Sequence, residues 1–269
     1  MIGRVLVDGE ERDQVSVLDR GLGYGDGLFE TIRFIGRDAP LWTRHMRRLE
    51  EGCRRLGLPM PRPATLLAEA RAVAQGLGQA VVRITLTRGV GARGYKPPAP
   101  THPTRVVAAF EPPPPDRAAQ VGGIRIRLCA TRLAPQPLLA GLKHLNRLEQ
   151  VLARAEWDDP AIAEGLTCDA DGLAVSATAA NLFAVFGGAL ATPAVDRCGV
   201  AGVGRAEILA AWPHAQVRQI KLEELRRADE LFLSSSVRGI LPVRELDGHA
   251  LAVGPVTRAL QAHWRELGF

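Results

Sequence analysis

The sequence predicts an α+β protein of two domains, and three observations support this prediction. The chain has 269 residues, more than one average domain needs. Apolar residues make up 46% and charged residues 23%, which are values of a globular protein with an ordinary core rather than of a disordered chain. Strand and helix patterns are mixed on both sides of a four-proline run, Glu111–Asp116, which we interpret as a stiff spacer.

The segment before the prolines begins with an alternating strand at Arg4–Asp8, which ends in the turn signal Asp8-Gly9. A glycine-rich stretch, DRGLGYGDGLFETIRF, follows from Asp19. Apolar residues then recur at helical spacing over 41–56, and Gly57 ends that helix. A second helix is expected over 65–74, and buried strands are expected at 80–87 and 105–110. We therefore expect a small N-terminal α/β domain over residues 1–111.

After a proline-rich linker at 112–120, a larger domain is expected over 121–269. Its helices are predicted at 145–157, 203–211, 222–228 and 255–267. Its strands are predicted at 124–129, 165–168, 173–175, 181–186, 190–192, 230–233 and 241–243. The uncharged stretch 173–195 is long enough to span a bilayer. Ser176, Thr178, Asn181, a glycine pair and Pro193 interrupt it, so a hairpin of buried strands is the better interpretation.

The composition excludes several classes of protein. The formal net charge is +5, and the basic excess is nearly all arginine, scattered among acids. This pattern, with only 5% aromatic residues, disfavours a nucleic-acid partner and suits a small anionic substrate. The four cysteines lie far apart without a CxxC or zinc spacing, which indicates reduced thiols, a cytoplasmic protein and no metal site. The N-terminus becomes charged too early for a signal peptide, and no membrane partner is expected.

Common nucleotide and hydrolase motifs do not explain the chain. The sequence has no GxxxxGK[ST], HExxH or GxSxG motif. One GxGxxG motif occurs at 89–94 after a predicted strand, as a dinucleotide-binding motif should. It runs directly into Tyr95-Lys96-Pro97-Pro98, which cannot open the helix that such a site requires. We therefore reject a nicotinamide cofactor.

The chain has only three lysines, and one of them suits covalent chemistry. A lysine that forms a Schiff base must be desolvated so that it spends time as a free amine. Lys96 precedes two prolines in a loop, and Lys221 opens a charged helix. Lys143 lies in the apolar segment LLAGLKHLNRL and is the best candidate. From the residues alone, an ordinary surface lysine before a helix is an equally good interpretation.

Two turns in the second domain have the features of phosphate sites. The glycine-rich segment GVAGVGR, 199–205, leads directly into a predicted helix, where backbone N–H groups can hold a phosphate. The sequence LSSS, 233–236, ends a predicted strand and offers hydroxyl groups. Each feature alone is more often a plain turn. Together with an amine-bearing lysine they suggest pyridoxal 5′-phosphate (PLP), a phosphate-bearing aldehyde.

Five segments carry a resemblance to a known family. They are DRGLGYGDGLFETIR (19–33), RGVGARGY (88–95), LAGLKHLNRLEQVLARAE (139–156), AANLF (179–183) and CGVAGVGR (198–205). The chain resembles the fold-type IV PLP enzymes, or class IV aminotransferases, which include branched-chain and D-amino-acid aminotransferases. Within this group it is most similar to the 4-amino-4-deoxychorismate lyases. The resemblance implies a small N-terminal domain, a larger C-terminal domain with a β-barrel-like core, and a homodimer.

The resemblance also implies residue roles toward the cofactor. Lys143 would bind the aldehyde carbon of PLP and act as the catalytic acid and base. Arg48, three residues after a histidine, matches the arginine that binds the PLP phosphate, although a surface helix arginine is an alternative. The backbone amides of Gly202 and Val203 and the hydroxyl of Ser236 would complete the phosphate site.

Other matching positions concern the substrate and the electronics of the cofactor. Arg93 and Tyr95 match positions that meet a substrate carboxylate in relatives, and Tyr24 lies in the segment that faces the active site. Ser176 stands where relatives have a glutamate that pairs with the pyridine nitrogen of PLP. A serine cannot hold the pyridinium proton by charge, so the cofactor should be a weaker electron sink. Asp169 and Asp171 are possible replacements for that glutamate.

The expected function is the lyase reaction of 4-aminobenzoate synthesis, in which 4-amino-4-deoxychorismate loses pyruvate. Aromatisation of the ring supplies much of the driving force, so this reaction can tolerate a weaker electron sink. One alternative is a D-amino-acid or branched-chain aminotransferase that uses the same lysine. A second alternative, from another class, is a non-catalytic PLP-binding protein that arose by loss of the glutamate.

Overall fold

The structure is a computed structural model that describes residues 2–269. The chain forms two compact units. Unit 1 contains the residues up to Pro113 together with the segment Leu142–Asn146, and unit 2 contains Pro114–Gly141 and Arg147–Phe269. Residues 117–120, expected as linker, instead begin the helix α4 (Arg117–Gly122). The segment around Lys143, expected in the second domain, belongs to unit 1.

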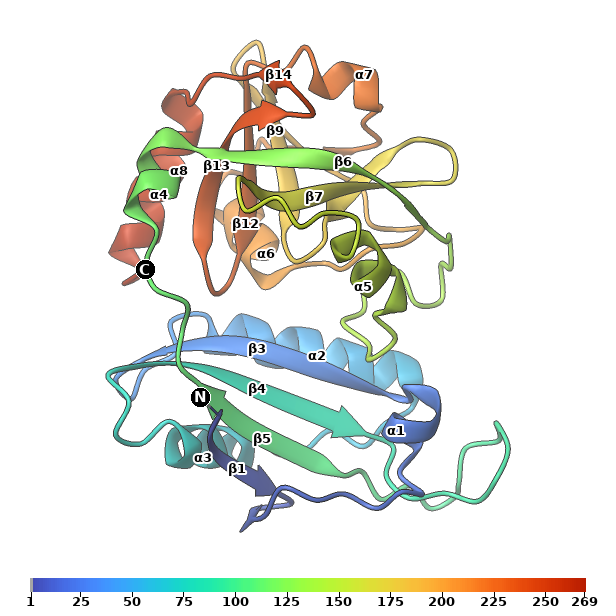
Figure 1. The fold of residues 1–269 in the computed structure, drawn as a ribbon. Helices are drawn as coiled ribbons and strands as arrows, with labels where there is room; N and C mark the ends of the chain where they lie inside the picture. Colours follow the sequence, from blue (N-terminus) through green and yellow to red (C-terminus); the bar gives the residue numbers. More distant parts are fainter. Residues whose placement is uncertain (1) are drawn as a thin grey trace. The chain divides into compact units, whose positions relative to one another are not determined.

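Unit 1 is an antiparallel sheet covered by helices on one face (Figure 1). The sheet order is β2-β1-β5-β4-β3, and every neighbouring pair is antiparallel. The strands are β1 (Ile2–Val7), β2 (Glu10–Glu11), β3 (Gly27–Ile35), β4 (Gln79–Thr87) and β5 (Arg105–Phe110). The helices are α1 (Arg20–Tyr24), α2 (Trp42–Leu56) and α3 (Pro63–Val73).

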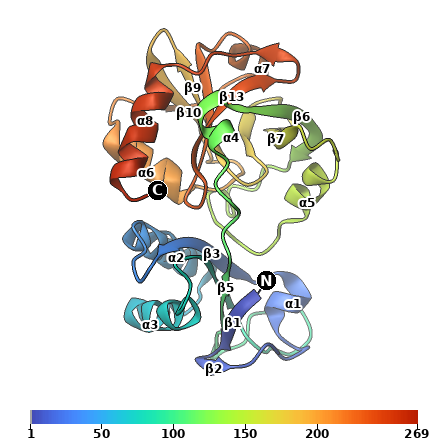
Figure 2. The same ribbon diagram turned by 60° about the vertical axis from the view of Figure 1, so that its left-hand side comes forward.

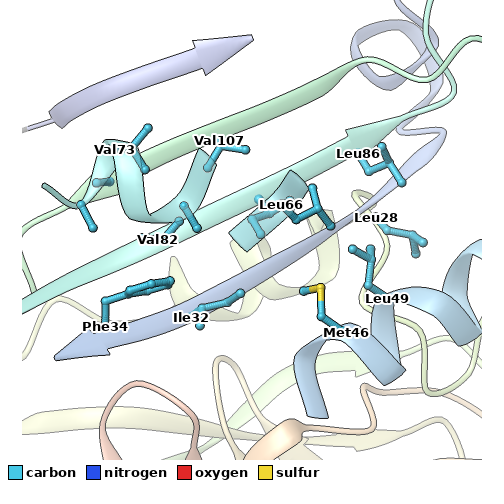
Figure 3. Close-up of a cluster of buried hydrophobic side chains, with 14 of the residues drawn as sticks. Leu28, Ile32, Phe34, Met46, Leu49, Leu66, Val73, Val82, Leu86 and Val107 are labelled. Carbon is cyan, nitrogen blue, oxygen red and sulfur yellow. The ribbon is translucent and has the colours of Figure 1, made fainter. Parts of the chain in front are cut away.

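Side chains alternate between the two faces of β3, and this alternation explains why the helices cover one face of the sheet. Leu28, Ile32 and Phe34 point into a core that α2 and α3 close (Figure 3). The α2 side chains Met46 and Leu49 enter the same core because they lie three residues apart on one helix face. The sequence analysis assigned no strand to this glycine-rich stretch. Its glycines lie at the start of the strand and before it, so the run from Leu28 onward pairs with β4 without interruption.

Unit 2 is built on a nine-stranded mixed sheet in the order β11-β10-β9-β12-β13-β6-β7-β8, with β14 beside β13. The sheet curls, so that β8 also lies against β9 and β10. The strands are β6 (Ile124–Leu133), β7 (Ile162–Asp169), β8 (Ala174–Ala177), β9 (Asn181–Phe186), β10 (Ala189–Pro193), β11 (Gln216–Arg218), β12 (Glu230–Ser235), β13 (Gly239–Leu246) and β14 (His249–Ala250). This curled sheet confirms the barrel-like core expected for the larger domain.

The helices of unit 2 are few and mostly short. They are α4, α5 (Leu148–Arg154), α6 (Val203–Ala211), α7 (Leu222–Leu225) and α8 (Pro255–Glu266). Figure 2 shows α6 and α8 on one side of the unit 2 sheet. Both helices contact β12. The helix expected over 145–157 is shorter at both ends, because α5 spans only Leu148–Arg154. At its N-terminal end, the backbone of Leu145 pairs with β3 of unit 1 instead of joining the helix.

Three findings bear on expectations drawn from composition. All four cysteines are free and buried. Within residues 2–269, no helix combines the length and the hydropathy that a membrane crossing requires. In the same residues, no group of three or more metal-ligating side chains comes together.

Candidate active site

Lys143 lies in unit 1, where its segment extends the edge of the sheet beside β3. The amide of Phe29 donates to the carbonyl of Lys143 over 3.0 Å, and the amide of Leu145 donates to the carbonyl of Gly27 over 3.0 Å. This pairing brings the Lys143 amine, Nζ, to 4.1 Å from the centroid of the Phe29 ring. Phe29 is itself buried, with 8% of its surface exposed.

Lys143 is thus the lysine with the most apolar surroundings. Its side chain is half-buried, whereas Lys96 and Lys221 are exposed. An amine that faces an aromatic ring exchanges part of its hydration for a weak cation–π contact. The Arg83 guanidinium lies 4.2 Å from the centroid of the same ring, so two cations approach Phe29. This setting places the Lys143 amine in a partly desolvated position beside an aromatic ring, where a nucleophilic lysine could act.

Glu30, His45 and Arg48 form a buried cluster between β3 and α2. Arg48 donates from Nε to Glu30 Oε1 over 2.8 Å and from Nη2 to Glu30 Oε2 over 2.5 Å. His45 Nδ1 lies 2.6 Å from Glu30 Oε2. Burial alone would raise the pKa of Glu30, but the charges and hydrogen bonds of Arg48 and His45 outweigh it and lower this pKa to about 2. Glu30 is therefore ionised at neutral pH and holds Arg48 in place.

His45 is fully buried, and its environment fixes its protonation. Burial lowers the pKa of His45, Glu30 raises it, and the positive charges of Arg48 and Lys143 lower it further, with a net decrease. The ring is therefore neutral at pH 7 and carries its proton on Nδ1, which donates to Glu30. Among the described residues, His45 Nε2 has no hydrogen-bond partner. The sequence analysis did not assign a role to His45, and no sequence signal distinguishes it from an ordinary helix histidine.

The predicted substrate segment 93–95 is attached to helix α1 by two residues. The buried side chain of Arg20 donates to the carbonyls of Gly94, over 2.8 Å, and Tyr95, over 3.0 Å. Tyr24 accepts a hydrogen bond from the amide of Gly94 over 3.1 Å, and its ring centroid lies 5.5 Å from that of Tyr95. Arg93 and Tyr95 are exposed. Arg20, which the sequence analysis missed, is therefore the main support of this loop.

The predicted phosphate turn lies in unit 2, at the start of α6. Gly202 is the N-cap of this nine-residue helix, and no side chain caps it, so its first backbone N–H groups remain for another acceptor. A Cβ on Gly202 would lie 1.9 Å from Asn181 Oδ1, and one on Gly204 would lie 3.2 Å from the carbonyl carbon of Ser235. Only glycines allow this close packing. An uncapped helix start packed against a serine-rich strand end fits a phosphate group.

The neighbouring strand end supplies hydroxyl groups. Ser234 Oγ, on a residue that is 1% exposed, has no hydrogen-bond partner among the described residues. Ser236, the predicted ligand, follows β12 directly. Buried hydroxyls without partners are rare in proteins, and they often mark a place where another molecule completes the hydrogen bonding.

Ser176 lies on β8 of unit 2 with a half-buried side chain, and its carbonyl accepts a hydrogen bond from Thr167 Oγ1 over 2.8 Å. The two suggested replacements for the family glutamate are bound elsewhere. Asp169 Oδ1 accepts from the amides of Asp171 and Leu173 in the β7–β8 turn, and Arg197 pairs with both carboxylates. Both carboxylates stabilise this turn, and the suggestion that Asp169 or Asp171 replaces the glutamate stays a prediction.

Comparisons with known proteins identify the family of the chain. The sequence model described as amino-transferase class IV matches residues 27–246. An aminodeoxychorismate lyase of Vibrio harveyi is 35% identical over 96% of this chain and 98% of its own length. A crystal structure of 4-amino-4-deoxychorismate lyase from Pseudomonas aeruginosa is 48% identical, with a TM-score of 0.93 over 97% of this chain and 98% of that one.

A branched-chain amino acid aminotransferase of Escherichia coli is more distant. Its crystal structure is 26% identical, with a TM-score of 0.87 over 99% of this chain and 95% of that one. The family model covers well over half of the chain, and the Vibrio relative matches almost all of it. The chain therefore belongs to the class IV aminotransferase family, in its fold-type IV architecture.

Proposed function

We propose that the protein is a PLP-dependent lyase that converts 4-amino-4-deoxychorismate to 4-aminobenzoate and pyruvate. The observation that carries the proposal is the Lys143 amine held over the Phe29 ring, within a segment and a fold shared with lyases of this name. Bound PLP supplies an electron sink for the carbon that loses its proton. The remaining steps belong to residues of this chain.

Lys143 would hold PLP through its aldehyde carbon. Its amine would also serve as the base that removes the proton from the amine-bearing ring carbon of the substrate. Arg48, oriented by Glu30, binds phosphate oxygens in this proposal, together with the amides of Gly202 and Val203 and the Ser236 hydroxyl. Arg93, Tyr95 and Tyr24 bind the anionic substrate. Ser176 would lie at the pyridine nitrogen, as the resemblance implies, and would supply no negative charge there.

The alternative function is transamination of D- or branched-chain amino acids, which the similarity to the Escherichia coli enzyme supports. The test incubates purified holoenzyme with aminodeoxychorismate and, separately, with 2-oxoglutarate and a panel of amino acids. Formation of 4-aminobenzoate with little keto acid exchange supports the lyase. Efficient amino transfer without 4-aminobenzoate supports the aminotransferase, and bound PLP without either product supports a non-catalytic protein.

We also propose that the protein is a cytoplasmic homodimer. Large apolar side chains are exposed around α1 and the 88–95 loop, among them Val17 at 82%, Leu22 at 67% and Tyr95 at 86%. Such a concentration of exposed apolar groups is typical of a surface that a second copy covers. The buried free cysteines support a reducing compartment. Light scattering of the purified protein tests the dimer, and a monomer mass at working concentration contradicts it.

A further inference from the structure

We propose that Asn181 is the positioning residue of the phosphate-binding turn, a role that rests on the proposed use of PLP. Asn181 is the first residue of β9 and is 6% exposed. Its Nδ2 donates to the carbonyl of Val200 over 2.9 Å. Its Oδ1 occupies the space that a Cβ on Gly202 would need. One side chain therefore fixes the turn on both sides of Ala201.

The anchor of this contact is rigid. Asn181 pairs with Ser234 of β12, and two residues further along the same two strands Phe183 pairs with Phe232. These two rings are fully buried and stack with centroids 5.0 Å apart. Strand pairing next to these stacked rings fixes the Asn181 backbone, so its side chain has few alternative positions.

The turn itself needs outside support. Its glycines have little intrinsic preference for one conformation, and Gly199 adopts a left-handed φ of 83°. The backbone of Gly141 holds the turn on one side, through hydrogen bonds with Gly199 and Ala201 of 3.0 Å each. Asn181 holds it at Val200. This bond joins the residues just before the N-cap of α6 directly to the start of β9.

The direction of the backbone amides at Gly202 and Val203 depends on this attachment. These amides lie at the start of α6, where the helix dipole and the uncapped N–H groups favour an anion. A hydrogen bond to phosphate weakens when its donor no longer points at the oxygen. Loss of Asn181 should therefore weaken the binding of a phosphate-bearing ligand and leave contacts to other parts of that ligand unchanged.

The experiment compares PLP with pyridoxal, which has the same aldehyde and ring but no phosphate. The apoenzyme of each variant is titrated with both compounds, and covalent attachment to the lysine is followed by absorbance. We expect Asn181→Ala to weaken PLP binding by about tenfold, the effect of one lost hydrogen bond at a charged ligand, and to leave pyridoxal binding unchanged.

Two further variants sharpen the test. Gly202→Ala keeps the Asn181 side chain but pushes it away from Val200, so it should show the same selective loss for PLP. Thr192→Val is the matched control. Thr192 is fully buried on the neighbouring strand, and its Oγ1 donates to the carbonyl of Leu182 on β9 over 2.8 Å rather than to the turn. It should lower the melting temperature while preserving both affinities.

The possible outcomes separate the inference from the function on which it rests. An unchanged ratio of PLP to pyridoxal affinity in folded Asn181→Ala overturns the positioning role, and so does an equal loss for both compounds. If Asn181→Ala does not fold, Asn181→Leu, which keeps the size of the side chain but cannot donate to Val200, decides by the same ratio. If the wild-type protein itself binds PLP no better than pyridoxal, then the proposed phosphate site is wrong. In that case the positioning role of Asn181 is wrong as well.

Discussion

The buried cluster of Glu30, His45 and Arg48 gives the sharpest prediction of stability. Substituting Glu30→Gln keeps the shape of the side chain but removes its charge. Glu30 and His45 are each about 1% exposed at the side chain, and Arg48 is 13% exposed. The variant therefore leaves the Arg48 charge buried without its carboxylate. Removing one partner of a buried ion pair costs about 3–5 kcal/mol of folding free energy.

The pKa of Glu30 gives a second estimate of the same quantity. Its ordinary value is 4.5 and its value in the folded protein is about 2. At about 1.4 kcal/mol for each pH unit, the difference amounts to about 3 kcal/mol. Because the folded pKa lies below the unfolded one, this stability is present above pH 4.5 and is lost as the pH falls from 4.5 toward 2. The lowered pKa of His45 adds a loss in the same direction, which begins as the pH falls below 6.5.

The assay is urea unfolding followed by circular dichroism, with wild type and Glu30→Gln measured from pH 7 down to the lowest pH at which both refold. We expect the wild type to be more stable by about 3 kcal/mol at pH 7. The two unfolding free energies should converge as the pH falls below 4.5. A difference that stays constant down to pH 3, or a variant as stable as the wild type at pH 7, would refute the assignment of a buried, ionised Glu30.

Three further substitutions test the site. Arg48→Ala should weaken PLP binding by about ten- to a hundredfold, and an unchanged dissociation constant would restrict Arg48 to its pairing with Glu30. Arg20→Met should raise the KM for aminodeoxychorismate by about tenfold while PLP affinity stays constant, because the 93–95 segment loses two hydrogen bonds to its carbonyl groups. An unchanged KM would argue against this loop as a substrate site. Ser176→Glu should raise the ratio of transamination to lyase turnover, and efficient transamination by the wild type would contradict the reasoning about the missing charge.

Much of the fold could be predicted from local patterns. The helices at 41–56, 203–211 and 255–267 agree with α2, α6 and α8 to within about one residue at each end, because each has strong periodicity or a glycine or proline boundary. The sequence did not indicate α4, since four prolines before it suggested an extended spacer. Asp116 accepts a hydrogen bond from the amide of Ala119 and begins this short helix within the expected linker.

The candidate site shows where local patterns are insufficient. The apolar setting of Lys143 was readable from its neighbours, but its ring partner, Phe29, lies more than a hundred residues away along the chain. Arg20 likewise supports a loop 74 residues away. Glu30 and His45 are only 15 residues apart, but their contact depends on how α2 packs against β3. Hydrophobic periodicity specifies neither the pairing of distant strands nor the packing of a helix on a sheet. The resemblance identified the positions of the site, and the structure supplies the contacts that orient them.

The central claim is that Lys143 carries the cofactor, and borohydride reduction of the holoenzyme tests it most directly. Reduction makes the bond between PLP and its lysine permanent, and mass spectrometry of peptides then locates the pyridoxyl group. We predict a single modified residue, Lys143, and no modification in a Lys143→Ala variant that retains the wild-type circular dichroism spectrum. A pyridoxyl group on Lys96 or Lys221 in the wild type, with Lys143 unmodified, would contradict the account.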